Sequence, residues 1–195
     1  GYVKGTNFFV FPYDWRKDIR SSKDSLDRLI EQAKTASGQS KVNLVTHSMG
    51  GLIARYYISD TTKAAKVNKL IELGVPHLGT VDSLKTLRYG SWLGYDFRLF
   101  TVGIPPSEIK DGAQNFSSVF ELIPSSKYYD FYNNSDTIFP YPYRDDRDID
   151  NNKETGALNF NQIKNLLSNL GHNITVFSMG EQFHNSLDSI LNQTN

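Results

Sequence analysis

The sequence has no cysteine among its 195 residues, which excludes disulfide bonds and metal sites built on thiolates. Its 21 basic and 21 acidic residues balance, so the chain lacks the net positive charge with which proteins attract nucleic acids. No apolar run approaches the roughly 18 residues of a membrane-spanning helix. We therefore expect a globular chain that uses no metal or other cofactor, binds no nucleic acid and is long enough to bury a substantial core.

The strongest local signal lies at residues 41–58. An apolar run at 42–45 predicts a buried strand, which stops at the sequence Thr-His-Ser-Met-Gly and passes directly into an apolar stretch that predicts a helix. A strand that turns sharply into a helix through x-His-Ser-x-Gly is typical of a nucleophile elbow, whose turn lifts the serine hydroxyl above the sheet edge. Thr46 replaces the usual first glycine of this pattern, but two glycines follow the serine. The pattern favours Ser48 as a nucleophile over an ordinary serine in a strand–helix turn.

The position of Ser48 also indicates where a negative charge would be stabilised. Because the serine precedes a helix, the Met49 N–H and the positive end of the helix face the place where an oxyanion would form. Met49 is therefore expected to supply one backbone donor of an oxyanion hole.

Apolar runs that alternate with helical periodicities predict an α/β fold with a mostly parallel sheet. Ser48 should lie at a carboxyl end of this sheet. Helices are expected at 22–33 and at 160–167. Four strands are expected, near residues 7–11, 41–46, 69–74 and 173–179.

Residues 81–169 lack this regular alternation. A structureless loop of that length is not credible inside a compact domain, so we expect an inserted subdomain at about 81–169 within one domain that spans 1–195. Its many Tyr, Phe and Trp side chains favour a cap over Ser48 that presents an apolar pocket to a long acyl chain. The alternative is a folded excursion with a small core of its own, and the two interpretations are compatible.

Three further residues are weaker candidates for the site. His77 follows the third predicted strand, in a Pro/Gly-rich loop at the end of the sheet that carries the ligand crevice in open α/β folds. A lone loop histidine is nevertheless more often a packing or hydrogen-bonding group. Glu181 follows the last predicted strand, where a triad acid is expected, and His184 comes shortly after it.

Three sequence blocks resemble the lecithin:cholesterol acyltransferase family of α/β-hydrolases and its bacterial relatives. They are Pro-Tyr-Asp-Trp-Arg at 12–16, Val-Thr-His-Ser-Met-Gly-Gly at 45–51 and Pro-His-Leu-Gly-Thr at 76–80. The segment Glu-Leu-Ile-Pro-Ser at 121–125 resembles a further family feature. The resemblance implies an α/β-hydrolase fold with an inserted cap, Ser48 as the nucleophile, the Met49 amide as an oxyanion donor, and ester hydrolysis or acyl transfer on lipids.

Two elements of that family have no counterpart in the sequence. The first strand, with the loop that supplies the second oxyanion donor, would precede Gly1, and the Gly-Asp-x-x-Val acid block and final histidine would follow Asn195. None of the histidines fits the chain order serine, acid, histidine. His47 adjoins the nucleophile, His172 precedes the last predicted strand, and His184 follows it at the distance expected of the acid. We therefore expect that these residues do not form a complete catalytic triad on their own.

Two functions of different classes follow from these patterns. The first is a serine acyl-ester hydrolase or lipid O-acyltransferase in which Ser48 carries the acyl group to water or an alcohol. The second is a non-catalytic binding domain of hydrolase fold with an incomplete triad; a peptidase or thioesterase on the same scaffold is a third. The expected partner is a lipid or other acyl-ester substrate, with peripheral contact to a lipid surface, and a secreted or cell-surface location is favoured over a cytoplasmic one.

Overall fold

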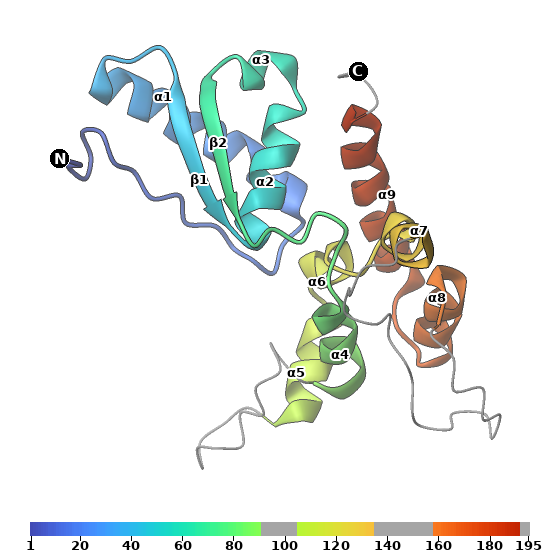
Figure 1. Ribbon diagram of the computed structural model, residues 1–195. Helices are drawn as coiled ribbons and strands as arrows, with labels where there is room; N and C mark the ends of the chain where they lie inside the picture. Colours follow the sequence, from blue (N-terminus) through green and yellow to red (C-terminus); the bar gives the residue numbers. More distant parts are fainter. Residues whose placement is uncertain (91–104, 135–157, 192–195) are drawn as a thin grey trace. The chain divides into compact units, whose positions relative to one another are not determined.

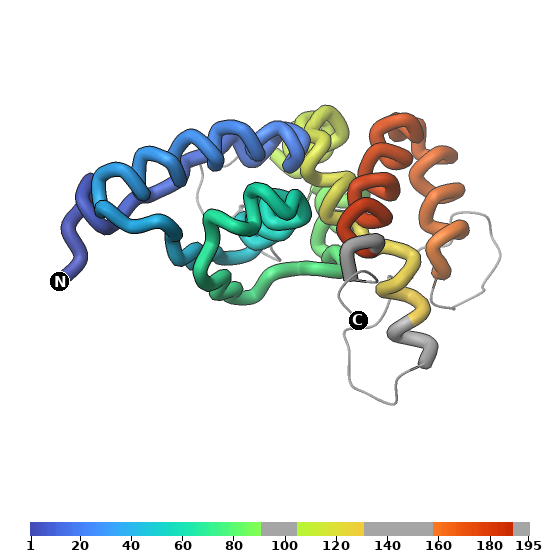
Figure 2. The backbone as a smooth tube through the Cα atoms, turned by 90° about the horizontal axis from the view of Figure 1, so that it is seen from above, coloured from blue at the N-terminus to red at the C-terminus, as the bar shows by residue number. Residues whose placement is uncertain are grey.

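The computed structural model describes residues 1–90, 105–134 and 158–191 (Figure 1). These residues fall into two compact units. The first comprises Gly1–His77 and Asn185–Asn195, and the second comprises Leu78–His184. In Figure 2 the backbone passes from the blue and teal segments of the first unit into the helices of the second.

A two-stranded parallel sheet forms the centre of the first unit (Figure 1). Strand β1 (Val42–His47) pairs with β2 (Val67–Leu73), and Val45 lies opposite Ile71. Helix α2 (Met49–Ile58) lies between the two strands in the chain, as a parallel pair requires a crossover connection. Both strands predicted for this stretch are confirmed.

Three further helices of the first unit lie before β1 or between α2 and β2. Leu26 and Ile30, one helical turn apart, are buried. Gly38 ends their helix in a left-handed conformation (φ 69°) that glycine adopts without strain. The helix predicted at 22–33 is confirmed. These helices are the 3-10 helix η1 (Ile19–Ser22), α1 (Lys23–Ser37) and α3 (Thr61–Ala64).

Asp27 on α1 joins three elements of the first unit. Its carboxylate accepts hydrogen bonds from Tyr57 Oη (2.7 Å), Lys63 Nζ (2.5 Å) and Lys66 Nζ (2.7 Å). Burial alone would raise the pKa of Asp27, but these three donors hold that pKa well below its usual range. Because Lys66 immediately precedes β2, the network stands at the amino end of the strands and serves the fold.

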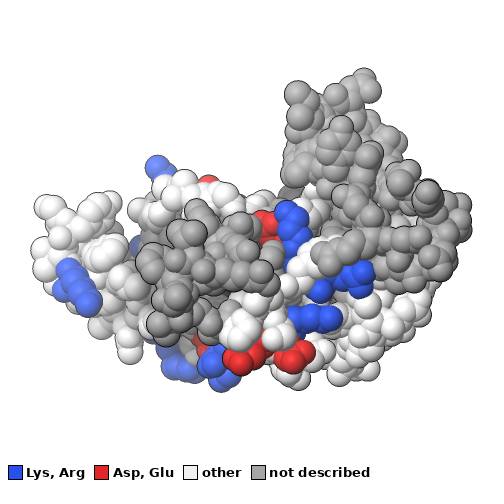
Figure 3. Space-filling model, turned by 90° about the horizontal axis from the view of Figure 1, so that it is seen from below, with Lys and Arg blue, Asp and Glu red and all other residues white. Residues whose placement is uncertain are grey.

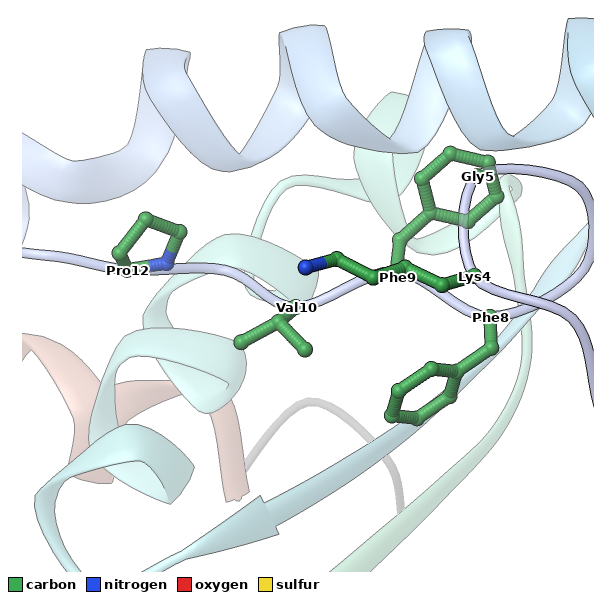
Figure 4. A pocket seen from close by; sticks show the side chains of 6 residues that line it. All are labelled: Lys4, Gly5, Phe8, Phe9, Val10 and Pro12. Carbon is green, nitrogen blue, oxygen red and sulfur yellow. The ribbon is translucent and has the colours of Figure 1, made fainter.

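The strand predicted at residues 7–11 is wrong. Figure 4 shows Phe9 on the side of α1, while Phe8 and Val10 point the opposite way, so the segment is extended. Among the described residues its strand-like pairing is limited to an isolated bridge between Lys4 and Phe8. A strand is defined by hydrogen bonds to a neighbour, and the sheet of the described chain consists of β1 and β2. Phe8 and Val10 consequently stay 48% and 60% exposed.

A small pocket of about 370 Å³ opens along this N-terminal segment (Figure 4). Its lining is mostly apolar and comes entirely from the segment itself, without a residue of the turn that contains Ser48. The lining residues are Lys4, Gly5, Phe8, Phe9, Val10 and Pro12.

The second unit is built from helices in its described part. Helices α8 and α9 lie side by side in both views (Figure 1, Figure 2). Asn159 and Gln162 close a capping box at the start of α8, and the helix predicted at 160–167 is confirmed. From Asn185 onward α9 belongs to the first unit. The helices are α4 (Val81–Tyr89), α5 (Pro106–Ala113), α6 (Ser117–Glu121), α7 (Ser126–Asn134), α8 (Phe160–Asn169) and α9 (Ile174–Leu191).

The strand predicted at 173–179 is wrong, because these residues begin the long helix α9. The β-branched run at 174–176 favours a strand locally, but burial along the segment follows helical spacing, so packing overrides local preference. A Cβ on Gly180 would lie 2.4 Å from the backbone oxygen of Phe120, so glycine alone allows this close approach to α6. The buried positions are Phe177, Gly180, Phe183, His184, Leu187 and Asp188.

Aromatic side chains of the predicted insert form a core within the second unit. Phe120 and Phe177 are 2% and 3% exposed. Phe160 packs on Phe177 and on Tyr129, with ring centroids 5.6 and 6.3 Å apart. The described part of the insert therefore shares a hydrophobic core with α9, and its place as an inserted subdomain stays a prediction. Other aromatic residues of the predicted insert, at 92–100 and 141–143, lie outside the described residues.

His172 is a buried ionisable side chain in the turn between α8 and α9. Its predicted place ahead of a strand is wrong, since a helix follows it. It is 5% exposed, and neither ring nitrogen has a hydrogen-bond partner among the described residues. Burial lowers the pKa of His172, and the positive charges of Lys110 and Arg88 lower it further. The folded chain therefore resists protonation at this position.

We expect the free energy of unfolding to decrease as the pH falls below about 6.5, the ordinary pKa of an unfolded histidine. Below that pH the unfolded chain binds a proton that folded His172 does not, which removes up to about 1.4 kcal/mol per pH unit until the lowered folded pKa is reached. Urea unfolding from about pH 7.5 to about pH 5.5 should show a shallower decline for His172→Leu than for the unmodified protein. Identical declines in the two proteins would contradict this account.

Candidate active site

Ser48 stands between β1 and α2 in a sharp strand-to-helix turn. Its backbone has φ 51° and ψ −130°, and it is the one non-glycine residue with positive φ in the described part of the chain. Such a conformation costs on the order of 1–3 kcal/mol and persists only where the surroundings hold it. The turn that the sequence predicts around Ser48 is therefore present, in the strained form expected of an elbow.

Two backbone hydrogen bonds hold this turn. The Ser48 N–H donates to the carbonyl oxygen of Leu73 at the end of β2 (3.0 Å), and the Gly51 N–H donates to the carbonyl oxygen of Ser48 (3.0 Å). The first bond fixes the turn to the neighbouring strand, and the second begins α2. Ser48 is thus held at the carboxyl end of the parallel strands, where open α/β sheets bind their ligands.

The two glycines after Ser48 differ in how much space surrounds them. A Cβ on Gly51 would lie 2.1 Å from Cγ2 and 2.6 Å from Cγ1 of Val75. A Cβ on Gly50 would meet Tyr13 Oη at 3.7 Å, which is an ordinary contact. Gly51 is therefore the glycine that lets α2 pack against the segment following β2.

The Ser48 hydroxyl is not used to cap α2. Ser48 occupies the N-cap position, yet its side chain makes no capping hydrogen bond, and the residue is partly exposed. The first N–H groups of a helix have no acceptor within it, so Met49 and Gly50 present amides at its positive end. Amides at this end of a helix can stabilise a negative charge that develops beside them.

The Tyr-Asp-Trp-Arg sequence forms a fixed turn in the same unit. The Asp14 carboxylate accepts hydrogen bonds from Arg16 Nε (2.8 Å) and Nη2 (2.9 Å). These bonds hold the pKa of Asp14 well below its usual range. Tyr13 stacks on Phe11 with ring centroids 6.0 Å apart, and burial raises the pKa of its hydroxyl. The turn thereby brings Tyr13 to the start of α2.

His77 is engaged in a hydrogen-bond network. Its Nδ1 lies 3.4 Å from Arg55 Nη1, and its Nε2 lies 3.1 Å from Glu72 Oε2. Because a guanidinium can only donate, Nδ1 accepts and Nε2–H donates to the carboxylate. Arg55 also donates to the carbonyl oxygen of Leu187 (3.2 Å) and lies 3.8 Å from the Asp188 carboxylate. His77 thus has the hydrogen-bonding role that is common for a lone loop histidine.

Glu181 and His184 both lie on α9, so their predicted position beyond a final strand is wrong. Glu181 accepts a hydrogen bond from Lys164 Nζ (3.3 Å) on α8. His184 is 3% exposed and packs edge to face against the ring of Phe183. Both belong to the second unit, whereas Ser48 belongs to the first. Their part in a catalytic triad remains a prediction.

Two further sequence blocks are joined by residues that lie in the second unit. The Thr80 N–H donates to the carbonyl oxygen of Leu122 (2.7 Å), and the Ser125 N–H donates to the carbonyl oxygen of Leu78 (2.9 Å). The blocks at 76–80 and 121–125 are therefore joined through their backbones. The family resemblance includes both segments but does not predict this contact.

The described surface carries both signs of charge. Lys and Arg side chains and Asp and Glu side chains all appear on the face shown in Figure 3. No helix of the described residues has the length and apolar character needed to cross a membrane. The same residues contain no group of three or more His, Asp or Glu side chains placed to hold a metal ion.

Comparison with known proteins connects this geometry to a family. The family model "Lecithin:cholesterol acyltransferase" matches residues 1–194. The chain is similar to lecithin-cholesterol acyltransferase-like 1 of Arabidopsis thaliana, at 25% identity over 142 residues that cover 66% of the chain and 32% of the relative. It is also similar to phospholipase A(1) LCAT3 of the same plant, at 36% identity over 83 residues that cover 40% and 19%.

A solved structure supports the fold. The crystal structure of the Tle4–Tli4 complex contains a chain that matches with a TM-score of 0.57 at 18% identity, covering 90% of this chain and 41% of that one. Together with the family match, this confirms the predicted α/β-hydrolase fold. The chain spans a third or less of the length of these two curated relatives.

Proposed function

This chain belongs to the lecithin:cholesterol acyltransferase family, and on that basis we propose that it carries the nucleophilic serine of an enzyme acting on lipid acyl esters. The observation that supports this assignment most directly is the backbone of Ser48. A non-glycine residue at φ 51° in a turn between a parallel strand and a helix is a strained conformation, and such strain is typical of functional positions.

In the proposed reaction Ser48 Oγ attacks the ester carbonyl carbon, while its proton passes to a histidine base. The π electrons of the carbonyl group move to its oxygen, which the Met49 N–H stabilises at the positive end of α2. Departure of the alcohol, protonated by the same histidine, leaves an acyl group on Ser48. Water then releases a fatty acid, or a second alcohol accepts the acyl group, and either step restores the serine.

The proposed substrates are phospholipids and related lipid esters. The names of two relatives, an acyltransferase-like protein and a phospholipase A(1), support this class. A buried acyl methylene contributes about 0.8 kcal/mol, so an apolar site would favour long acyl chains without charged contacts. Such substrates are held in lipid surfaces, and the proposal therefore includes peripheral contact of the protein with one.

We expect a fluorophosphonate probe to label the full-length protein at Ser48, because the probe reacts with serines that a base activates. Gel fluorescence would measure the extent of labelling, and mass spectrometry of the peptides would locate it. Heat-denatured protein serves as the control. Absence of labelling in the folded protein, or labelling at another serine, would favour a non-catalytic binding domain.

A further inference from the structure

Tyr13 has no role in the reaction described above, although its side chain reaches the helix that follows the nucleophile. Its hydroxyl lies 3.7 Å from the position that a Cβ on Gly50 would occupy. Gly50 is the second residue of α2 and follows Ser48 by two positions. The Tyr-Asp-Trp-Arg turn thus contacts the first turn of the elbow helix.

This contact places the Tyr13 hydroxyl at the first turn of the helix that follows Ser48. Every Cα–Cβ bond of an α-helix tilts toward the amino end of that helix, so the Cβ position of Gly50, which lies 3.7 Å from Tyr13 Oη, is displaced toward that end. The amides of Met49 and Gly50, which have no acceptor within the helix, stand at the same end. The Tyr13 hydroxyl therefore lies beside the first turn of α2, which is the turn that carries these two amides.

The phenol ring is held in place, while its hydroxyl remains available. Stacking on Phe11 and the Asp14–Arg16 ion pair immediately after it restrain Tyr13. In the described part of the chain the hydroxyl makes no hydrogen bond, and the residue is partly exposed. Burial raises its pKa, so the phenol keeps its proton and remains a donor at neutral pH.

We propose that the Tyr13 hydroxyl donates a hydrogen bond to the ester carbonyl oxygen while Ser48 attacks, and so acts with the Met49 N–H on the oxyanion. This inference rests on the proposed function and adds a side-chain donor to it. The bond that forms is between Ser48 Oγ and the carbonyl carbon, and the electrons that move belong to the C=O π bond. Tyr13 keeps its own proton throughout, so its contribution is electrostatic and grows as charge develops on the oxygen.

The test replaces Tyr13 by phenylalanine, which removes the hydroxyl and retains the ring that stacks on Phe11. Loss of one oxyanion donor lowers kcat by about 10²- to 10³-fold, and we expect a fall of that size for p-nitrophenyl ester hydrolysis by the full-length protein, with KM nearly unchanged. Labelling of Ser48 by a fluorophosphonate, whose P=O oxygen develops similar charge, should slow in parallel. Tyr56→Phe, at the other end of α2, is the matched control and should keep the original kcat.

Two comparisons separate the possible outcomes. If the unmodified protein is not labelled at Ser48, the proposed function itself fails and the role of Tyr13 falls with it. If Ser48 is labelled but Tyr13→Phe retains its kcat, the inference alone is overturned. Phe11→Leu weakens the stacking that restrains Tyr13 but keeps the hydroxyl, so we expect it to lower Tm and to reduce kcat much less than Tyr13→Phe does. If Phe11→Leu and Tyr13→Phe lose kcat equally, Tyr13 acts through packing alone, and this result would also overturn the inference.

Discussion

Replacement of Ser48 by alanine is expected to lower kcat for ester hydrolysis by on the order of a millionfold. The reason is that the acyl-enzyme route requires an oxygen on this side chain, and the backbone donors alone supply a small part of the rate enhancement. Hydrolysis of p-nitrophenyl esters of increasing acyl length by the full-length protein measures the loss. The decline should be found at every chain length, because the missing atom takes part in bond formation rather than in substrate binding.

Ser59→Ala is the matched control for this experiment. Ser59 follows the other end of α2, where its hydroxyl donates to the carbonyl oxygen of Tyr56 (2.7 Å). Its loss should leave kcat intact and change stability by only about 0.5 kcal/mol. Ser48→Ala should retain the Tm of the unmodified protein, since its side chain makes no capping bond. Retention of more than a trace of activity in Ser48→Ala would place the nucleophile elsewhere.

The second large effect is expected from an added methyl group at Gly51. In Gly51→Ala the new Cβ would meet Cγ2 of Val75 at 2.1 Å, and a β-branched side chain has little freedom to move away. Overpacking of this kind costs about 1–3 kcal/mol, which urea or thermal unfolding would detect. Activity should fall as well, because α2 must shift relative to the strand end that holds Ser48.

Two variants test this explanation of the Gly51 position. Gly50→Ala adds the same methyl group one residue earlier, where the nearest atom is 3.7 Å away, and should keep or slightly raise stability because alanine favours a helix. Val75→Ala combined with Gly51→Ala removes both clashing methyl groups and should restore part of the loss. If Gly50→Ala and Gly51→Ala are equally stable, the packing argument is wrong.

The elbow could be predicted from sequence because its determinants are local. A short apolar strand, a serine in the turn and small residues after it occupy fewer than a dozen consecutive positions, and each constrains the backbone directly. The distinction between Gly50 and Gly51 could not be predicted, since it depends on Val75, which belongs to the segment after the next strand. Local patterns indicate where a turn lies, whereas packing partners decide which residue is indispensable.

The two wrong strands show where local preference fails. Residues 7–11 have the apolar composition of a strand, but in the described chain they lack a neighbouring strand along which to form a hydrogen-bond ladder. Residues 174–176 are β-branched, yet Phe177, Gly180 and Phe183 continue a helical spacing that buries one face of α9. The helical period was present in the sequence, and following it across Gly180 would have identified the helix.

Interactions between residues that lie far apart in the chain could not be predicted from the sequence. Arg55 meets His77 and Leu187, which lie 22 and 132 positions away. The Tyr-Asp-Trp-Arg motif is visible in the sequence, but the contact of Tyr13 with the helix after Ser48 depends on how two elements cross. Sequence motifs therefore indicate candidate residues, but they do not predict which other residues those candidates contact.

The β1–α2–β2 element also has a consequence for the way in which this part of the protein forms. Residues paired between the two strands are 25 or 26 positions apart, and the bond from Ser48 to Leu73 spans a similar distance. Closing a loop of this length costs less entropy than pairing segments that lie further apart in the chain. The contacts that fix the turn around the serine are therefore contained in one continuous stretch, from the start of β1 to Val75, and they use no residue of the second unit.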